Sequence, residues 1–260
     1  MIKKAHKELT ILKTKITITP KSELLGFISN SLKKNVQLFV TTPNPEIILK
    51  AHSNNSYRKV INESDIAVPD AVGVCWAIRL LHQKSIKRIP GRELFLDLLN
   101  IANEKSLHIY LLGASKDVND TALAKIHTDY PQINVKGSSD IKINSKSPFD
   151  IKNYRKQYSE IVKDINDHKT DMLFVFLGAP AQELWFYAQK KHLKVKLAAT
   201  LGGSLDYYVG RQVIPPNLIS RLGLEWLWRL VFQPTRIKRI VNAVVLFPLL
   251  VLKEKYLSNN

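Results

Sequence analysis

Six short apolar runs, separated from one another by longer stretches with helical spacing, constrain the fold of this chain most strongly. The runs suited to buried strands are VQLFVT (36–41), DIAVP (65–69), HIYLLG (108–113), INVKG (133–137), DMLFVFLG (171–178) and KLAATLGG (196–203). Helical spacing covers about 45–56, 71–82, 92–105, 116–129, 152–168, 181–192 and 217–232. Several runs are apolar on both faces, which is typical of parallel strands covered by helices. The pattern predicts an α/β fold with a largely parallel sheet flanked by helices.

Polar and glycine-containing segments follow five of the predicted strands. They are TTPNPE, PDAVG, LLGASKD, FLGAPAQE and TLGGSLD. Ligands of Rossmann-like sheets bind beyond the carboxyl ends of the strands. We therefore expect these five segments to meet at one edge of the sheet and to form the functional site.

The chain is strongly basic, and its charge is concentrated at the two ends. It has 39 Lys and Arg against 22 Asp and Glu, a net charge of +17, and residues 1–40 and 211–260 each contribute +6. This excess predicts an anionic partner. Nucleic acid is not the expected partner, because we find no helix-turn-helix, zinc-finger spacing or RNP-like motif. We expect an α/β core over 1–210, with a long loop at 138–156, and a basic and apolar C-terminal appendage over 211–260.

Cysteine content and the N-terminal residues bear on the compartment. Cys75 is the only cysteine, which excludes an intramolecular disulfide and a cysteine-built zinc site and favours a reducing compartment. The first residues, MIKKAHKELTILKTKITI, lack the apolar core and cleavage site of a secretory signal. We expect a protein that is not exported.

An uncharged run near the C-terminus suggests a membrane surface. Residues 240–252, IVNAVVLFPLLVL, lie between basic flanks, with Trp226 and Trp228 upstream. Thirteen residues are too few to cross a bilayer, which needs about 20, and Pro248 interrupts the run. The pattern fits a segment lying in the headgroup region of an acidic membrane. A buried C-terminal helix has the same periodicity and is the alternative.

Two segments place polar side chains directly after the first two strands. TPNPE (42–46) carries the Thr42 hydroxyl and the Asn44 amide, with prolines that fix the turn. Asn44 is also suited to cap the following helix. Asp70, in PDAVG, is either a cap of the helix beginning near Ala71 or a general base for an acceptor hydroxyl at the mouth of the sheet.

Later segments offer groups that suit a nucleotide sugar. Arg88, before a Pro-Gly turn, can meet a phosphate bidentately, although an exposed arginine is equally compatible with the sequence. Gly113 allows a phosphate to approach the backbone, and the Gln182 amide can bond to a sugar or base. The remaining candidates, which offer backbone amides and a carboxylate or form a structural turn, are Gly202, Gly203 and Asp206.

The sequence contains no pattern typical of a metal site. There is no D-x-D pair, and the seven histidines never fall in H-x-x-x-H spacing. We therefore expect no metal and no other cofactor. Arginines and helix N-termini would neutralise a leaving phosphate.

The wording and order of these segments resemble the WecG/TagA/CpsF glycosyltransferase family (glycosyltransferase family 26). The matching stretches are TPNPE (42–46), PDAVGVCWAIRLL (69–81), KRIPGREL (87–94), LLGASKD (111–117), FLGAPAQE (176–183), LGGSLDYYVG (201–210) and RLGLEWLWRL (221–230). Together they extend from about residue 36 to 240, nearly the whole chain.

The resemblance implies a cytoplasmic, metal-independent, inverting enzyme, peripheral on the inner face of the cell membrane. Such an enzyme moves N-acetylmannosamine or its uronic acid from a UDP-sugar to a polyprenyl-diphosphate-linked GlcNAc acceptor. The products feed teichoic acid and other bacterial surface polysaccharides, in cell wall biogenesis. The resemblance also suggests a homo-oligomer, which nothing in the sequence itself indicates.

Site residues are carried over by motif. Thr42 and Asp70 match the family's active-site threonine and aspartate, and Asp70 matches its proposed base. Arg88 matches an arginine near the donor or acceptor phosphates. The positions that match donor-site residues are Asn44, Gln182 and Asp206. The family's C-terminal appendage, expected to bind the membrane and bring arginines to the active site, corresponds to the segment holding Arg229, Arg236 and Arg239.

Several positions depart from the family pattern. P-D-G-x-G has Ala71 in place of its first glycine, so we expect a tight backbone position to be filled by a methyl group. The lysine of G-A-P-K-Q-E is Ala181, a basic residue common ahead of A-P is Ile214, and E-P-R-R reads QPTR (233–236). The residues Thr42, Asp70, Gln182 and Asp206 all remain, so we expect a working enzyme.

The predicted mechanism is a single in-line displacement. Asp70 takes the proton from the acceptor hydroxyl as that oxygen attacks the anomeric carbon and inverts it, Thr42 orients the acceptor hydroxyl or a donor oxygen, and UDP leaves. One alternative is a non-catalytic nucleotide-sugar or nucleic-acid binding module. Another is a glycosyltransferase with a different hexose donor or a soluble acceptor, with 240–252 buried in its core.

Overall fold

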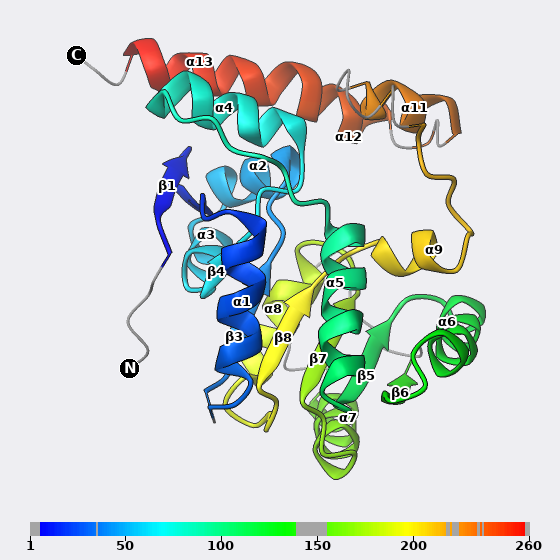
Figure 1. Cartoon of the computed structure of the whole chain (residues 1–260). Coiled ribbons are helices and arrows are strands. Elements are labelled where there is room, and N and C mark those ends of the chain that lie inside the picture. The colour runs from blue at the N-terminus through cyan, green and yellow to red at the C-terminus, as the bar shows by residue number, and fades with distance from the viewer. Residues whose placement is uncertain are drawn as a thin grey trace.

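The centre of the protein is a six-stranded parallel sheet. The computed structural model describes residues 6–34, 36–138, 155–216, 219, 224–232, 235 and 237–257. The strand order is β4-β3-β8-β7-β5-β6 (Figure 1), and the strands are β3 (Leu38–Thr41), β4 (Ile66–Ala67), β5 (His108–Gly113), β6 (Asn134–Ser138), β7 (Met172–Phe176) and β8 (Leu197–Thr200). Each overlaps one of the six apolar runs, so the predicted α/β fold is confirmed.

Alternate residues of the strands enter two hydrophobic cores, one on each face of the sheet. In β7, Phe174 packs in the first core, whereas Leu173 and Val175 pack in the second. Helices cover both faces, which explains why the strands are apolar along their whole length. The first face is covered by α1 (Lys21–Ser31), α5 (Gly91–Glu104) and α6 (Lys116–Asp129), and the second by α2 (Pro45–Ser53), α3 (Asn55–Asn62), α7 (Arg155–Asp167) and α8 (Ala181–Gln189).

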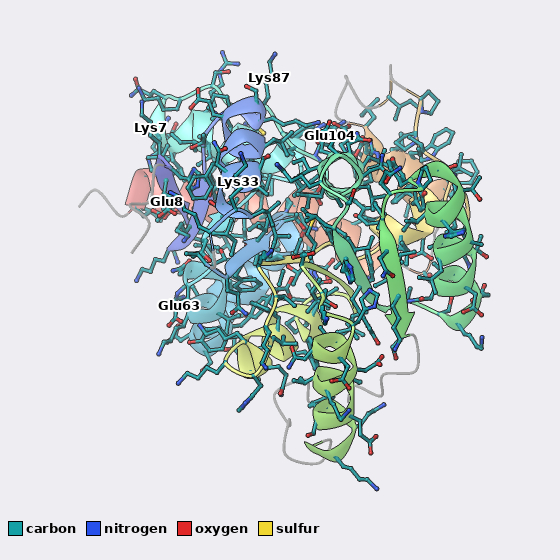
Figure 2. All side chains as sticks on the ribbon, turned by 60° about the horizontal axis from the view of Figure 1, so that its bottom comes forward. Lys7, Glu8, Lys33, Glu63, Lys87 and Glu104 are labelled. Carbon is teal, nitrogen blue, oxygen red and sulfur yellow. The ribbon has the colours of Figure 1, made fainter. Side chains whose placement is uncertain are left out.

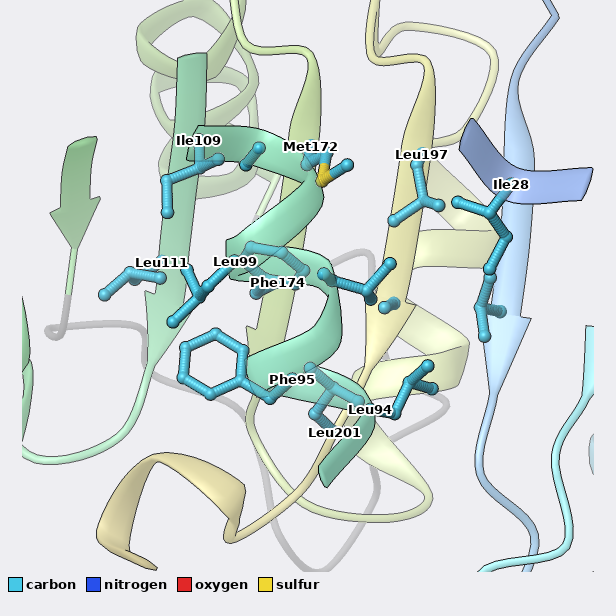
Figure 3. Packing of buried hydrophobic residues seen from close by; sticks show 14 of the residues in the cluster. Ile28, Leu94, Phe95, Leu99, Ile109, Leu111, Met172, Phe174, Leu197 and Leu201 are labelled. Atoms are coloured by element: carbon cyan, nitrogen blue, oxygen red, sulfur yellow. The ribbon is translucent and has the colours of Figure 1, made fainter. Parts of the chain in front are cut away.

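Helix α5 lies across the middle of the sheet and is anchored by its apolar side. Figure 3 shows Leu94, Phe95 and Leu99 packed against β5, β7 and β8. The ring of Phe95 meets those of Phe174 and Phe176 edge to face, with centroid distances of 5.2 and 5.5 Å. This packing places the N-terminus of α5 at the carboxyl edge of the sheet.

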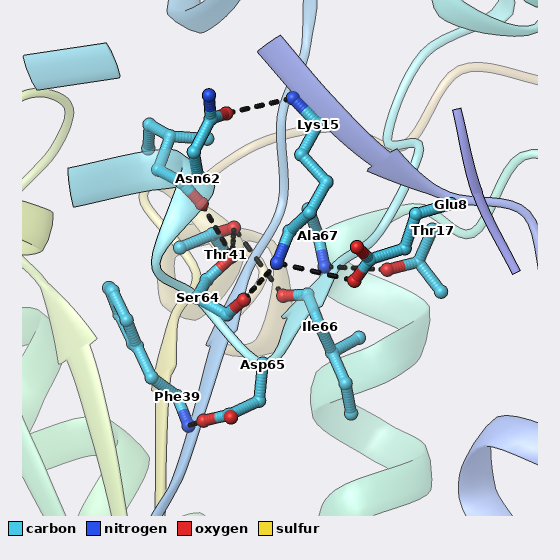
Figure 4. Close-up of polar contacts among 11 residues, drawn as sticks. Glu8, Lys15, Thr17, Phe39, Thr41, Asn62, Ser64, Asp65, Ile66 and Ala67 are labelled. Carbon is cyan, nitrogen blue, oxygen red and sulfur yellow. Dashed lines mark hydrogen bonds and ion pairs between the residues drawn. The ribbon is translucent and has the colours of Figure 1, made fainter. Parts of the chain in front are cut away.

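An N-terminal hairpin, β1 (Glu8–Ile11) and β2 (Thr14–Thr17), lies beside the edge strand β4. Buried Lys15 binds the carbonyl oxygen of Ser64 and pairs with Glu8 at 3.2 Å (Figure 4). One lysine of the basic N-terminus is therefore used inside the fold. Lys7 and Lys33 are exposed at the surface (Figure 2).

C-terminal helices lie beyond the carboxyl edge of the sheet, beside α4 (Val72–His82) (Figure 1). They are α11 (Glu225–Phe232), α12 (Ile237–Val241), the π-helix η3 (Asn242–Leu246) and α13 (Phe247–Leu257). Pro248 does not break the helix, because the widened turns of η3 precede it and a π-bulge accommodates the missing amide. Among the described residues, no helix is long and apolar enough to cross a membrane.

The run 240–252 is partly buried and partly exposed. Phe247 and Val251 are fully buried in a third core, formed with α2, α4 and the hairpin. On the same helical stretch, Val245 and Leu249 are 51% and 58% exposed. The stretch therefore packs on the protein with one side and presents an apolar side outward.

Some predicted boundaries were wrong or fall outside the described residues. The loop predicted over 138–156 is too long at its ends, because Ser138 closes β6 and Arg155 begins α7, while 139–154 lie outside the described residues. Of the helix predicted over 217–232, the structure describes α11 and isolated residues before it. The sequence did not predict α1, α3 or the hairpin.

Candidate active site

The segments after β3 and β8 are joined by the predicted catalytic threonine. Thr42 is buried, and its hydroxyl donates a 3.1 Å hydrogen bond to the carbonyl oxygen of Thr200. Two residues later, the Asn44 side chain accepts from the amide of Ile47 at 3.0 Å and so caps α2. The capping interpretation of Asn44 is confirmed, and the cap leaves the residue at the same strand end as Thr42.

Asp70 lies between the ends of β3 and β4 and the start of α5. Its amide donates to the carbonyl of Pro43 at 3.1 Å, and its Oδ1 accepts from the amide of Gly91 at 2.6 Å. The N-cap of α4 is Ala71, with no side-chain cap, so the prediction that Asp70 caps that helix is wrong. Asp70 instead meets the positive end of α5, which favours a carboxylate.

The glycine segment after β8 packs directly against this point. A methyl group on Gly91 would meet Ser204 Oγ at 3.1 Å and Asp70 Oδ1 at 3.8 Å. Gly202 has φ of +55°, a backbone conformation that glycine adopts without strain, and Gly203 is exposed. The segment 201–204 and Asp70 are therefore neighbours across the N-terminus of α5.

Asp206 and Gly203 also lie together. Asp206 follows in α9 (Ser204–Tyr208), and its Oδ2 lies 3.7 Å from the Cβ position of Gly203. The Asp206 carboxylate thus lies beside the glycine segment, at the position predicted to bind the sugar donor.

Gln182 is part of a buried hydrogen-bond network and binds the backbone of the glycine segment. Its Oε1 accepts from the amide of Gly202 at 3.0 Å, and its Nε2 donates to Glu183 at 2.6 Å. Glu183 is fully buried and also accepts from the Tyr57 hydroxyl at 3.0 Å. Burial raises the pKa of Glu183, while hydrogen bonds from Gln182, Tyr57 and Thr200 oppose that shift. Gln182 is 1% exposed, so in this structure it positions backbone.

Gly113 is explained by packing. It has φ of +100°, and a methyl group there would lie 2.7 Å from the Leu177 side chain. The next amide, of Ala114, donates to the carbonyl of Phe176 at 3.3 Å and joins the ends of β5 and β7. Only glycine fits this approach, so the residue is needed for the fold whatever it does for a ligand.

Arg88 is paired with the C-terminal region. Its Nη2 lies 2.9 Å from Glu225 of α11, and Arg92, in the first turn of α5, lies 3.5 Å from the same carboxylate. Burial lowers the pKa of Arg88, but Glu225 outweighs this and raises it, with smaller contributions from Glu93 and Asp70. The guanidinium is thus charged and lies within the electrostatic range of the Asp70 carboxylate.

A second ion pair joins α12 to the segment after β3. Arg239 Nη2 and Nε lie 2.6 and 2.8 Å from Glu46 Oε2, and Lys50 pairs with Glu46 Oε1 at 2.8 Å. Burial opposes ionisation, but these two cations lower the pKa of Glu46. Of the three arginines predicted to reach the site, only Arg239 has a described side chain, and it pairs with Glu46. The side chain of Arg229 and all of Arg236 lie outside the described residues.

The structure shows the surroundings of most positions that depart from the family pattern. Ala71 has φ of −131° and ψ of 153°, an extended conformation that any residue adopts, and its side chain packs against the third core. Near Ala181, Lys50 donates to the carbonyl of Ala179 at 2.8 Å and supplies an ammonium to that segment. Ile214 is 53% exposed, and of QPTR (233–236) the structure describes only Thr235.

Several residues of the site were not singled out from the sequence. Tyr57 and Thr200 complete the network around Glu183, while Arg92 and Glu225 surround Arg88. Arg92 lies four residues after Arg88 in the segment KRIPGREL, so the sequence could have indicated that it is part of the site. Tyr57 and Glu225 contact partners more than 120 residues away, at separations of 126 and 137, and no local pattern marks them.

The residue types that usually bind metal ions do not cluster in the part of the chain that the structure describes. Within it, no group of three or more His, Cys, Asp or Glu residues could hold a metal ion. Burial raises the pKa of the Cys75 thiol to about 11, despite the opposing charge of Arg88. A thiol of this kind is mostly protonated at neutral pH and is a poor nucleophile.

Comparisons with known proteins agree over nearly the whole chain. A sequence profile of the glycosyl transferase WecG/TagA/CpsF family matches residues 9–260. Relatives from Bacillus subtilis, Bacillus spizizenii and Staphylococcus aureus are 33%, 32% and 30% identical, over 90%, 85% and 84% of this chain and 88%, 83% and 81% of their own lengths. Each is named N-acetylglucosaminyldiphosphoundecaprenol N-acetyl-beta-D-mannosaminyltransferase.

Proposed function

The chain belongs to the WecG/TagA/CpsF glycosyltransferase family, and from this premise we propose that it transfers N-acetylmannosamine from its UDP-sugar to a polyprenyl-diphosphate-linked GlcNAc. The acceptor and the transferred sugar are those in the names of its relatives. The observation that carries the proposal is that three of the family's segments, TPNPE, KRIPGREL and LGGSLDYYVG, lie around Asp70 at the carboxyl edge of the sheet. The product would enter bacterial surface polysaccharide synthesis.

Asp70 is the proposed general base. The acceptor hydroxyl gives its proton to the carboxylate while its oxygen bonds to the anomeric carbon, and the bond from that carbon to UDP breaks. Attack opposite the leaving group inverts the anomeric centre. The amide of Gly91 fixes the orientation of the carboxylate through Oδ1, and a positioned base of this kind contributes roughly 10²–10⁴ in rate.

The neighbouring residues have supporting roles in this proposal. Gly202 and Gly203 let the backbone approach the donor diphosphate, and Asp206 bonds to a donor hydroxyl. Arg88 lies on the side facing α11 and stabilises the charge that develops on the leaving diphosphate. Thr42, fixed by Thr200, lines the same edge. This division requires no metal ion, because guanidinium groups and helix N-termini supply the positive charge.

The C-terminal helices are proposed to rest on an acidic membrane. These helices expose apolar side chains, namely those of Val231, Phe232, Ile237, Val241, Val244, Val245, Leu249 and Leu252. Lys253 and Lys255 follow in the same helix and suit anionic headgroups. A lipid-linked acceptor would then present its diphosphate beside the site that these helices cover. On this proposal the protein works on the inner face of the cell membrane, in contact with cytoplasmic UDP-sugars.

A donor and acceptor screen tests the function. Purified protein is incubated with single UDP-sugars, including UDP-N-acetylmannosamine, its uronic acid and UDP-glucose, and with a short-chain prenyl-diphosphate GlcNAc. We expect UDP release and a product heavier by one N-acetylhexosamine only with UDP-N-acetylmannosamine. Transfer from another donor, or to free GlcNAc without the lipid diphosphate, would contradict the proposal.

A further inference from the structure

Two arginines near Asp70 share one carboxylate. Arg88 and Arg92 place their Nη2 atoms 2.9 and 3.5 Å from the same Oε1 of Glu225. The three side chains are only 19%, 15% and 17% exposed. Glu93 lies 4.0 Å from Arg92 but is 48% exposed, so water screens its charge and it offsets the arginine weakly.

Arg92 stands where three parts of the site meet. It follows Gly91, whose amide binds Asp70 at 2.6 Å. Its guanidinium carbon lies 5.7 Å from the centre of the Tyr207 ring, which belongs to the segment after the two glycines. A cation over an aromatic face is held in place while its edge stays available for hydrogen bonds. Arg92 therefore faces the glycine segment on one side and Glu225 on the other.

The geometry suits a diphosphate. A guanidinium binds a phosphate through two parallel N–H bonds, and a diphosphate offers two phosphoryl groups. Glu225 presents one carboxylate to both guanidiniums and thereby keeps them adjacent. Building on the proposed function, we propose that Arg92 is a second phosphate-binding residue, which acts with Arg88 on the diphosphate of a substrate. That diphosphate belongs either to the nucleotide donor or to the lipid acceptor, and the experiment below separates the two.

Equilibrium binding to two probes tests the assignment. The probes are UDP and a short-chain prenyl-diphosphate GlcNAc, measured by calorimetry with the full chain. Loss of a charge-assisted, bidentate contact should weaken binding of at least one probe by about 10- to 100-fold in Arg92→Ala. Arg92→Lys keeps the positive charge but loses the bidentate geometry of the guanidinium, and should weaken binding of that probe by about 3- to 10-fold. The matched control is Arg58→Ala on α3, whose guanidinium bonds to Asn55; it should bind both probes as the unaltered protein does.

Each outcome decides the assignment. Weaker binding of UDP alone places Arg92 at the donor diphosphate, and weaker binding of the lipid probe alone places it at the acceptor diphosphate. If both Arg92 variants bind both probes as tightly as Arg58→Ala does, the assignment is overturned while the proposed function stands. If the unaltered protein binds neither probe, both fail. Should Arg92→Ala not fold, as judged by circular dichroism, Arg92→Lys decides by the same criteria.

Discussion

The amide of Gly91 donates a 2.6 Å hydrogen bond to Oδ1 of Asp70, and so joins the first residue of α5 to the segment after β4. The position of this amide is set by the core, because Phe95 and Leu94 of the same helix are fully buried against the sheet. The orientation of the Asp70 carboxylate therefore depends on the packing of α5 against the sheet.

Replacing Asp70 by Asn tests its role as base. The amide oxygen can still accept from Gly91, so the fold should persist, while the group can no longer take a proton. We expect the transfer rate to fall by about 10²–10⁴ with little change in the melting temperature. Single-turnover transfer and thermal unfolding measure the two quantities.

Asp171→Asn is the matched control for this change. The Asp171 carboxylate also accepts from a backbone amide, that of His108 at 3.0 Å, but at the amino ends of the strands. Its transfer rate per folded molecule should be unchanged. Full activity in folded Asp70→Asn would show that another group is the base.

The buried carboxyl of Glu183 should make stability depend on pH. Burial raises its pKa above the ordinary value of 4.5, so between the two values the native state holds a proton that the unfolded state has lost. The free energy of unfolding then falls as pH rises through that interval. Glu183→Gln removes the ionisation, and urea unfolding from pH 4.5 to neutrality should show a shallower decline for the variant than for the unaltered protein.

Exposed Glu104 offers the control for this pH dependence. Glu104→Gln should leave the slope as it is, because Glu104 lies at the surface of α5 (Figure 2). Equal slopes for Glu183→Gln and the unaltered protein would mean that the native and unfolded states bind the same number of protons at this position.

The packing of α13 predicts a large difference between two neighbouring residues. Phe247 is fully buried beside Ile48, Val74 and Ile78, and its removal leaves a cavity in the third core. Phe247→Ala should lower the free energy of unfolding by about 3–5 kcal/mol, whereas Leu249→Ala, at a position 58% exposed, should change it by less than about 0.5 kcal/mol. Equal effects in urea unfolding would contradict the packing of this helix on α4.

The central strands were predictable from sequence because their pattern is unambiguous. Ile109 to Leu112 and Met172 to Phe176 are apolar at every position, as strands covered on both faces must be. The hairpin of β1 and β2 was missed for a physical reason. Its turn places Leu12 and Lys13 at φ of 48° and 63°, where Gly or Asn is the usual signal, so the chain carries no turn residue there.

The location of the candidate site could be predicted from the sequence, but the hydrogen-bond and ion-pair partners of its residues could not. The strand ends predicted that Thr42 and Asp70 lie at one edge of the sheet, and the amide of Asp70 donates to the carbonyl of Pro43, the residue after Thr42. What Asp70 bonds to could not be read locally, because Gly91 lies 21 residues away and reaches it through the packing of α5. The same holds for Arg88, whose partner Glu225 comes from a C-terminal helix.

Chelation tests the expectation that no metal takes part. If arginines and helix N-termini stabilise the leaving diphosphate, transfer should continue at the same rate after dialysis against EDTA, and added Mg²⁺ or Mn²⁺ should not raise it. Loss of activity on chelation, with recovery on adding one of these ions, would assign the charge stabilisation to a metal.

The outward side of the C-terminal helices should govern membrane binding. Val245 and Leu249 are 51% and 58% exposed on it, so placing glutamate at both positions removes apolar contact with lipid and adds repulsion from anionic headgroups without disturbing a core. Each Leu or Val side chain contributes about 1.5–3 kcal/mol when fully buried, so binding to vesicles containing phosphatidylglycerol should fall by at least about tenfold. Sedimentation with vesicles measures this.

A control variant, and the dependence of vesicle binding on lipid charge and salt, complete this test of membrane binding. Leu96→Glu, on the exposed side of α5, adds a charge of the same kind at a position 40% exposed and should leave vesicle binding unchanged. Binding of the unaltered protein should weaken when phosphatidylcholine replaces phosphatidylglycerol or when salt is raised, because the lysines beside the apolar side act through screened attraction. Equal binding by the double variant and Leu96→Glu would show that some other surface meets the membrane.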